Sequence, residues 1–193
     1  KRRIPADPEQ RNSCAHGIGF AILVESDNTA AILLMRSAGG PAALTRFVRG
    51  LGDTVTRSDR YEPDMNRSAG VLDTTSPKAI ATTAQRLLLG DVLSAGARAQ
   101  LERGMTDCKP GLNRLRAVLP VSWQAADRPG TSVESKTNDY ALVRPPRRAP
   151  LIVAVYYDAP DVGLDAREAV LREAGTAFVQ WAEFHGPVTG STR

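Results

Sequence analysis

Arg60-Tyr61-Glu62-Pro63-Asp64-Met65-Asn66 places one carboxylate beside a proline and an amide, within a stretch that has little hydrophobic periodicity. The proline disfavours helical geometry at Glu62, so the segment is predicted to be a loop. Ser26-Asp27-Asn28 lies upstream of it, and Asp73-Thr74-Thr75-Ser76-Pro77 follows downstream. Each segment alone carries little information. Their order along the chain is the informative feature.

The composition is that of an ordinary globular protein, with 193 residues, 42% hydrophobic and 24% charged. The net charge is +4 and the sequence pI is about 9.4. The basic residues are scattered apart from Lys1-Arg2-Arg3 and the run from Arg144 to Arg148, and aromatic residues make up only 5% of the chain. Because no basic stripe alternates with aromatic side chains, we expect no nucleic-acid partner.

Cysteine and histidine are rare in this chain. Cys14 and Cys108 permit one disulfide without requiring it. His16 and His185 have no ligand-like spacing, so we expect no metal site and no cofactor. The longest apolar run, residues 151–157, is too short to span a bilayer. No signal peptide is visible in these residues.

Hydrophobic periodicity predicts helices first, then strands, then one more helix. Residues 1–12 are expected to be loop, and residues 53–73 form the largest predicted loop. The expected helices cover 29–36, 41–50, 77–90, 94–103 and a segment from about 165, and the expected strands cover 123–128, 140–143 and 151–157. This order predicts an α+β fold in a single domain, residues 1–193. Its helical lobe would span 13–119, and its strands and C-terminal helix 120–193.

Taken in order, the three opening segments resemble the class A serine β-lactamases, within the penicillin-recognising serine hydrolases. The likeness extends from about Ser26 to Trp181 and includes the run from Ser26 to Leu34 and that from Arg148 to Tyr157. The resemblance implies a helical lobe beside an antiparallel sheet with a C-terminal helix. It also implies hydrolysis of β-lactam antibiotics through a serine acyl-enzyme, a small-molecule substrate, a monomer, and a periplasmic or secreted location.

The resemblance assigns a role to each residue of the first two segments. Glu62 would be the base that activates the deacylating water, and Asn66 would help to hold that water. Ser26 would pass a proton to the β-lactam nitrogen, and Asn28 would bind the substrate's side-chain amide. Taken on residue type alone, Ser26-Asp27-Asn28 is a helix N-cap and the Glu62 segment is a polar surface loop. The penicillin-binding transpeptidases lack the glutamate loop, so Glu62 favours a β-lactamase.

Arg60 and Asp73 stand at the two ends of the Glu62 segment, which form its neck. Arg60 is expected to pair with Asp73 and so to close the loop.

The family's Lys-Thr-Gly motif corresponds here to Arg128-Pro129-Gly130. Arg128 would bind the substrate's carboxylate, and Gly130 is retained. Thr131 would supply an oxyanion donor and a carboxylate contact. Pro129 removes a hydroxyl and a backbone donor from the strand. Arg114 matches a second carboxylate-binding arginine of the family, although an ordinary surface arginine fits the sequence equally well.

Several departures weigh against activity. The family's nucleophile motif, Ser-x-x-Lys, occurs nowhere in the 193 residues, and the Glu62 loop is about two residues short. The stretch before Ser26 is too short for the family's first helix, two strands and nucleophile helix. We therefore expect a C-terminal portion of such an enzyme, processed, trimmed or truncated, and inactive by itself. The apolar pairs Leu33-Leu34 and Leu87-Leu88 should then lack partners.

Two alternatives remain. One is a non-catalytic β-lactamase-like module or degenerate remnant, which the substituted Arg128-Pro129 pair and the short loop would suit. The other is a relative of the penicillin-binding transpeptidases, which Glu62 disfavours.

Overall fold

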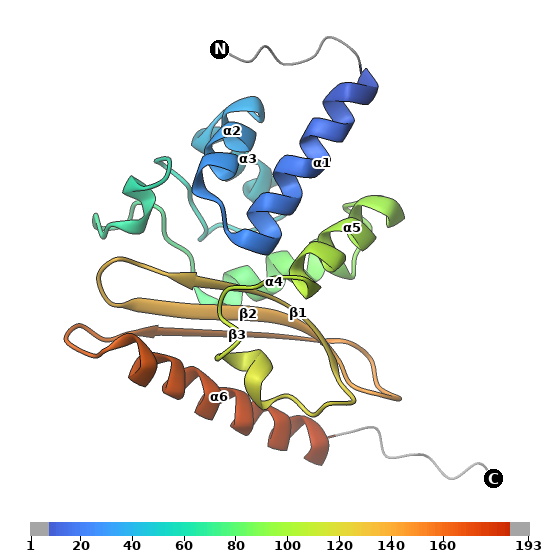
Figure 1. The fold of residues 1–193 in the computed structure, drawn as a ribbon, viewed down its shortest axis with the longest axis vertical. Coiled ribbons are helices and arrows are strands. Elements are labelled where there is room, and N and C mark those ends of the chain that lie inside the picture. Colours follow the sequence, from blue (N-terminus) through green and yellow to red (C-terminus); the bar gives the residue numbers. More distant parts are fainter. Residues whose placement is uncertain (1–7, 186–193) are drawn as a thin grey trace.

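The structure, a computed structural model, describes residues 8–185, with side chains described from Gly17 onward. Two layers of helices enclose one antiparallel sheet (Figure 1). The elements are α1 (Pro8–Glu25), α2 (Asn28–Ser37), α3 (Pro41–Gly50), the 3-10 turn η1 (Asp64–Asn66), α4 (Pro77–Leu88), α5 (Ala95–Thr106), the 3-10 turn η2 (Leu115–Val118), β1 (Gln124–Thr131), β2 (Lys136–Arg144), β3 (Leu151–Asp158) and α6 (Leu164–Phe184). The predicted α+β class is confirmed.

The sheet has the order β1-β2-β3, so that β2 is central within the described residues. Helices α4 and α5 pack on one of its faces, and α6 packs on the other (Figure 1). Helices α1, α2 and α3 continue the layer that contains α4 and α5. The turn between β1 and β2 and the end of β3 meet at one end of the sheet. The loop of residues 51–76, called here the Glu62 loop, lies near this end.

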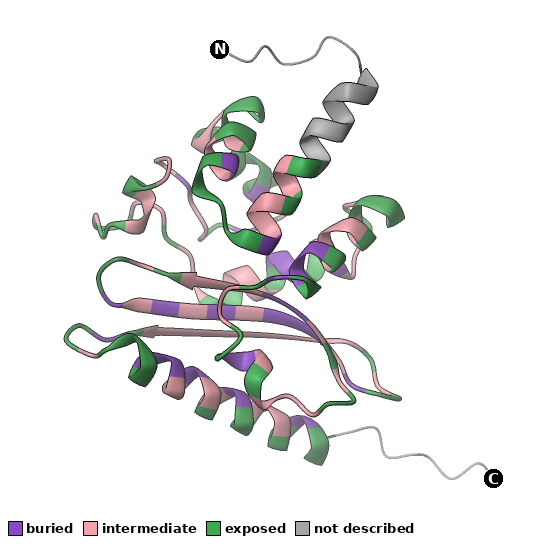
Figure 2. Ribbon diagram, in the orientation of Figure 1, coloured by how far each residue is buried: buried purple, intermediate pink, exposed green. Residues whose placement is uncertain are grey.

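Two hydrophobic clusters follow the alternation of side chains along β2. Leu142 joins Leu88 and Met105 beneath α4 and α5. Its neighbours Ala141 and Val143 belong to the opposite cluster, against which Phe178 of α6 packs. Figure 2 shows the resulting concentration of buried residues along β2. The central strand therefore holds both helical layers to the sheet.

Three expectations from the sequence are wrong in detail. Helix α1 begins at Pro8, within the predicted loop of residues 1–12, because proline is well suited to the first position of a helix. Strands β1 and β2 are both longer than predicted, because residues 129–131 pair with the polar first half of β2, which pairs with β3 as well. Leu88 is 2% exposed, since α4 packs it against the sheet. Leu33 is 51% exposed, as expected.

Among residues 8–185, none of the helices combines the length and the apolarity that a bilayer crossing requires.

Candidate functional site

The neck of the Glu62 loop is closed by an arginine and an aspartate. Arg60 Nε donates to Asp73 Oδ2 at 2.6 Å, and the other carboxylate oxygen of Asp73 accepts the N–H groups of Asp59 and Arg60. Burial alone would raise the pKa of Asp73. These hydrogen bonds outweigh burial, so the pKa lies below its ordinary value. The two ends of the loop are thus held together by a charged pair that stays ionised at neutral pH.

Glu62 and Asn66 face each other inside this loop. The peptide bond between Glu62 and Pro63 is cis, and η1 brings Asn66 back toward the carboxylate. Asn66 Nδ2 donates to Glu62 Oε2 at 2.5 Å. Burial raises the pKa of Glu62 and repulsion from Asp73 adds to this, although the Asn66 hydrogen bond opposes it. A carboxylate with a raised pKa and a fixed orientation is suited to general-base chemistry near neutral pH.

The Ser26-Asp27-Asn28 segment joins α1 to α2. Asp27 is the N-cap of α2, and its side chain accepts the N–H of Ala30 at 2.7 Å. The capping alternative therefore applies to Asp27. Ser26 has a φ of 56°, which is uncommon for a residue other than glycine, and both Ser26 and Asn28 are exposed.

Arg114 is buried, so its interpretation as a surface arginine is wrong. Its Nε donates to Glu168 Oε1 on α6 at 3.1 Å, and its Nη1 donates to the carbonyl oxygens of Gly130 and Asn138. Its Nη2 donates to the Thr131 hydroxyl at 2.5 Å. This guanidinium is committed to protein groups, and it orients Thr131 at the end of β1.

Arg128 points toward the helical layer. Its Nη1 donates to the carbonyl oxygen of Leu23 at 3.1 Å and contacts the sulfur of Cys108 at 3.6 Å. Side chains alternate along a strand, so Arg128 and Thr131 do not share a face. Cys108 is a buried free thiol, and burial raises its pKa. Cys14 lies outside the described side chains.

Pro129 is accommodated by a neighbouring turn. It lies on β1, an edge strand of the described sheet, where the loss of a backbone donor is tolerated. A Cβ on Gly111, which has a φ of +69°, would lie 2.5 Å from Pro129 Cβ. The turn therefore depends on glycine to pack against this proline.

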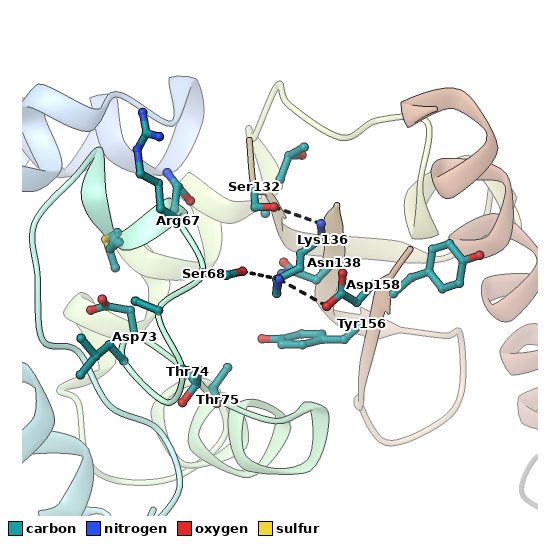
Figure 3. A pocket seen from close by; sticks show the side chains of 18 residues that line it. Arg67, Ser68, Asp73, Thr74, Thr75, Ser132, Lys136, Asn138, Tyr156 and Asp158 are labelled. Atoms are coloured by element: carbon teal, nitrogen blue, oxygen red, sulfur yellow. Dashed lines mark hydrogen bonds and ion pairs between the residues drawn. The ribbon is translucent and has the colours of Figure 1, made fainter. Parts of the chain in front are cut away.

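A cavity of about 360 Å³ lies between the Glu62 loop and the end of the sheet (Figure 3). Of the residues predicted from the sequence, Asn66, Asp73, Gly130 and Thr131 line it. The others lie outside the lining; they are Ser26, Asn28, Arg60, Glu62, Arg114 and Arg128. The structure thus brings the loop amide and the end of β1 to one cavity, but it does not bring Arg128 there.

Sequence reasoning missed the polar groups that cross this cavity. Lys136 Nζ donates to Ser68 Oγ at 2.6 Å and lies 3.3 Å from Asp158 Oδ2 (Figure 3). No motif marks these residues, although Lys136 is one of only four lysines in the chain. Among the described residues, no group of three or more His, Cys, Asp or Glu side chains is arranged to hold a metal ion.

Comparison with protein families gives one match over most of the chain. The model of the β-lactamase enzyme family matches residues 20–182. A β-lactamase of Streptomyces fradiae is 48% identical over 162 residues, which cover 83% of this chain and 53% of the relative. The carbapenem-hydrolyzing β-lactamase KPC of Klebsiella oxytoca is 42% identical over 172 residues, covering 88% of this chain and 59% of that protein.

Solved structures of β-lactamases are also similar to this chain. The crystal structure of a β-lactamase from Burkholderia vietnamiensis is 82% identical and superposes with a TM-score of 0.87. The match covers 89% of this chain and 64% of that one. The class A β-lactamase of the last common ancestor of Gram-negative bacteria is 47% identical with a TM-score of 0.83, and the match covers 89% of this chain and 65% of that one. The chain therefore spans between half and two thirds of the length of these four relatives.

Proposed function

The chain belongs to the β-lactamase enzyme family, with class A enzymes as its relatives, and from this we propose that it carries the deacylation part of a β-lactam-hydrolysing site. Glu62 would take a proton from the water that attacks the acyl-enzyme ester. Asn66 would orient both the Glu62 carboxylate and this water. One observation supports this proposal most strongly: Glu62 is a half-buried carboxylate with a raised pKa, and it accepts a hydrogen bond from Asn66 at 2.5 Å.

The remaining proposed roles differ in their support. Thr131 lines the cavity and is oriented by Arg114, which suits a contact to the substrate's carboxylate or to the oxyanion. Ser26 and Asn28 are exposed at the start of α2, which leaves them available to a substrate. Arg128 would have to leave Leu23 and Cys108 to reach one. The 193 residues contain no Ser-x-x-Lys, so we expect the isolated chain not to hydrolyse β-lactams.

A chimera tests the role of Glu62. Residues 20–182 replace the matching segment of the Burkholderia vietnamiensis β-lactamase, and hydrolysis of nitrocefin is followed together with the intact mass of the protein. We expect hydrolysis by the chimera and accumulation of an acylated species when Glu62→Gln is introduced. The control is Asp64→Asn, an exposed carboxylate in the same loop. Equal turnover by the chimera and its Glu62→Gln variant would refute the proposed role.

A non-catalytic module is the second candidate, and the orientation of Arg128 favours it. With that guanidinium bonded to Leu23 and Cys108, Arg128 does not supply a cation to the cavity for a carboxylate-bearing substrate. A folded chimera that neither acylates nor hydrolyses nitrocefin supports this candidate. If Arg128→Lys restores hydrolysis, the departure at this residue is the cause.

We also propose a small-molecule β-lactam as the ligand, a monomeric state, and a periplasmic or secreted location. Light scattering of the purified protein tests the monomeric state, and cell fractionation tests the location.

A further inference from the structure

The Glu62 loop is attached to the sheet at Ser68, beside Arg67, whose carbonyl oxygen accepts from Nη2 of the neck residue Arg60 at 2.8 Å. The backbone N–H of Ser68 donates to both carboxylate oxygens of Glu134, at 3.2 and 3.3 Å, and the Ser68 hydroxyl accepts from Lys136 Nζ at 2.6 Å. Glu134 lies in the turn between β1 and β2, and Lys136 begins β2. These contacts join segments that are more than 60 residues apart in the sequence.

Lys136 is anchored on the sheet side of this contact. Its backbone N–H donates to Ser132 Oγ at 3.0 Å. Its ammonium group lies 3.3 Å from Asp158 at the end of β3 and 3.9 Å from Glu134. One side chain thus reaches the loop, the β1–β2 turn and the end of β3. We call the contacts among Ser68, Glu134, Lys136 and Asp158 the polar clasp.

We propose that Lys136 is a positioning residue for this site: by holding Ser68 it keeps Asn66, two residues earlier, against Glu62. Two residues of extended chain span about 7 Å, so an anchored Ser68 leaves Asn66 little room to move. The catalytic importance of Glu62 rests on the proposed function, whereas the contacts of the polar clasp are observed independently of it.

The clasp acts locally because its members are partly exposed. The side chains of Lys136 and Glu134 are each 44% exposed, and ion pairs of this kind add little to global stability. Its loss would let residues 67–72 lift from the sheet and would admit water to Glu62. The pKa of Glu62 is raised chiefly by burial, so it reports directly on whether the loop stays closed.

Hydrogen exchange and a carboxyl titration test this proposal on the 193-residue chain. In Lys136→Met, amides of residues 67–72 should exchange roughly fivefold faster or more, while β2 stays protected. The pKa of Glu62, followed by carbon NMR, should fall toward its ordinary value. Lys136→Arg should restore both readouts in part. The matched control is Lys109→Met, which breaks an exposed ion pair with Glu25.

The proposal is overturned if Lys136→Met and Lys109→Met give the same exchange in residues 67–72. It is also overturned if exchange rises equally in β2 and the loop, because Lys136 would then act only on global stability. Neither measurement requires turnover, so a failure here is distinct from a failure of the proposed hydrolysis.

Discussion

Asp139 and Glu62 are two carboxylates that keep their protons more readily than exposed carboxylates do. Asp139 is fully buried in β2, and neither of its carboxylate oxygens has a hydrogen-bond partner among the described residues. Burial, together with repulsion from the equally buried Asp127, raises its pKa to about 8. Asp127 itself is paired with Arg116. Asp139 is therefore mainly protonated at neutral pH.

Asp139→Asn should remove a dependence of stability on pH. The unfolded chain releases this proton near pH 4, whereas the folded chain holds it until about pH 8. Stability should therefore fall as pH rises between these values, by at most about 1.4 kcal/mol per pH unit. The asparagine variant should lack this slope and be the more stable protein at pH 8. Urea unfolding between pH 5 and 8.5 measures it.

The control for that experiment is Asp107→Asn, an exposed aspartate that should leave the slope unchanged. A slope that is unchanged in Asp139→Asn would assign the dependence on pH to another group, such as Glu62.

Glu62→Gln should stabilise the protein at neutral pH. Because the folded pKa of Glu62 is raised above 4.5, the folded state binds this proton more tightly, and stability falls as pH rises through the interval above 4.5. Glutamine keeps an acceptor for Asn66 and removes the buried charge. We expect the midpoint of thermal unfolding at pH 7 to rise by about 2 °C. An unchanged or lower midpoint would contradict this.

Helix α5 meets α1 through a glycine. A Cβ added to Gly104 would lie 2.5 Å from Leu23 Cδ1 and 2.9 Å from Leu23 Cβ. Gly96, in the first turn of the same helix, has nothing within 4 Å of its added Cβ. The two positions therefore separate the packing role of glycine from its low helix propensity.

Gly104→Ala should destabilise the protein by about 1–3 kcal/mol because it overpacks the contact with Leu23. Gly96→Ala should stabilise it by up to about 1 kcal/mol, since alanine is the better helix former. Chemical denaturation of both variants measures these changes. A Gly104→Ala variant that is as stable as the parent or more stable would show that α1 and α5 can move apart at little cost.

Stability is distributed unevenly through the molecule. Helices α2 and α3 each contain a single buried residue, Ala30 and Val48, and they expose Leu33, Leu44 and Phe47. In contrast, β2 is paired on both sides and packed on both faces. The apolar contacts that hold α2 and α3 in the 193-residue chain are therefore few.

Native-state hydrogen exchange of this chain should reflect the difference. We expect amides in α2 and α3 to exchange at least about a hundredfold faster than those in the middle of β2, because segments with few buried contacts open locally. Mass spectrometry of peptic fragments measures this. Uniform protection across the helices and the sheet would contradict it.

The fold was predictable where the period of the apolar residues showed it. The helices from α2 onward and β3 follow that period closely. The first half of β2 does not follow an apolar period, because Thr137 and Asp139 are polar yet fully buried. Their side chains lie on the same face of β2 as Ala141 and Val143, the face that α6 and η2 cover, and a single sequence does not display that cover.

The site was predictable where its partners lie close together in the chain. Glu62 and Asn66 are four residues apart, and their spacing already suggested a shared task. The pairing of Lys136 with Ser68 joins positions 68 residues apart. The direction of Arg128 depends on which face of β1 meets the helices. Such relations arise only when the strands and the loop are assembled.

The neck of the Glu62 loop has a consequence for descent. Arg60 and Asp73 hold the ends together, so what lies between them can change in length without moving the sheet or the helices. The entropy of closing a loop varies only slowly with its length. Insertions and deletions between Arg60 and Asp73 should therefore disturb the fold less than insertions within a helix or strand. Lineages that share this scaffold can accumulate differently shaped cavities while the fold itself stays under selection.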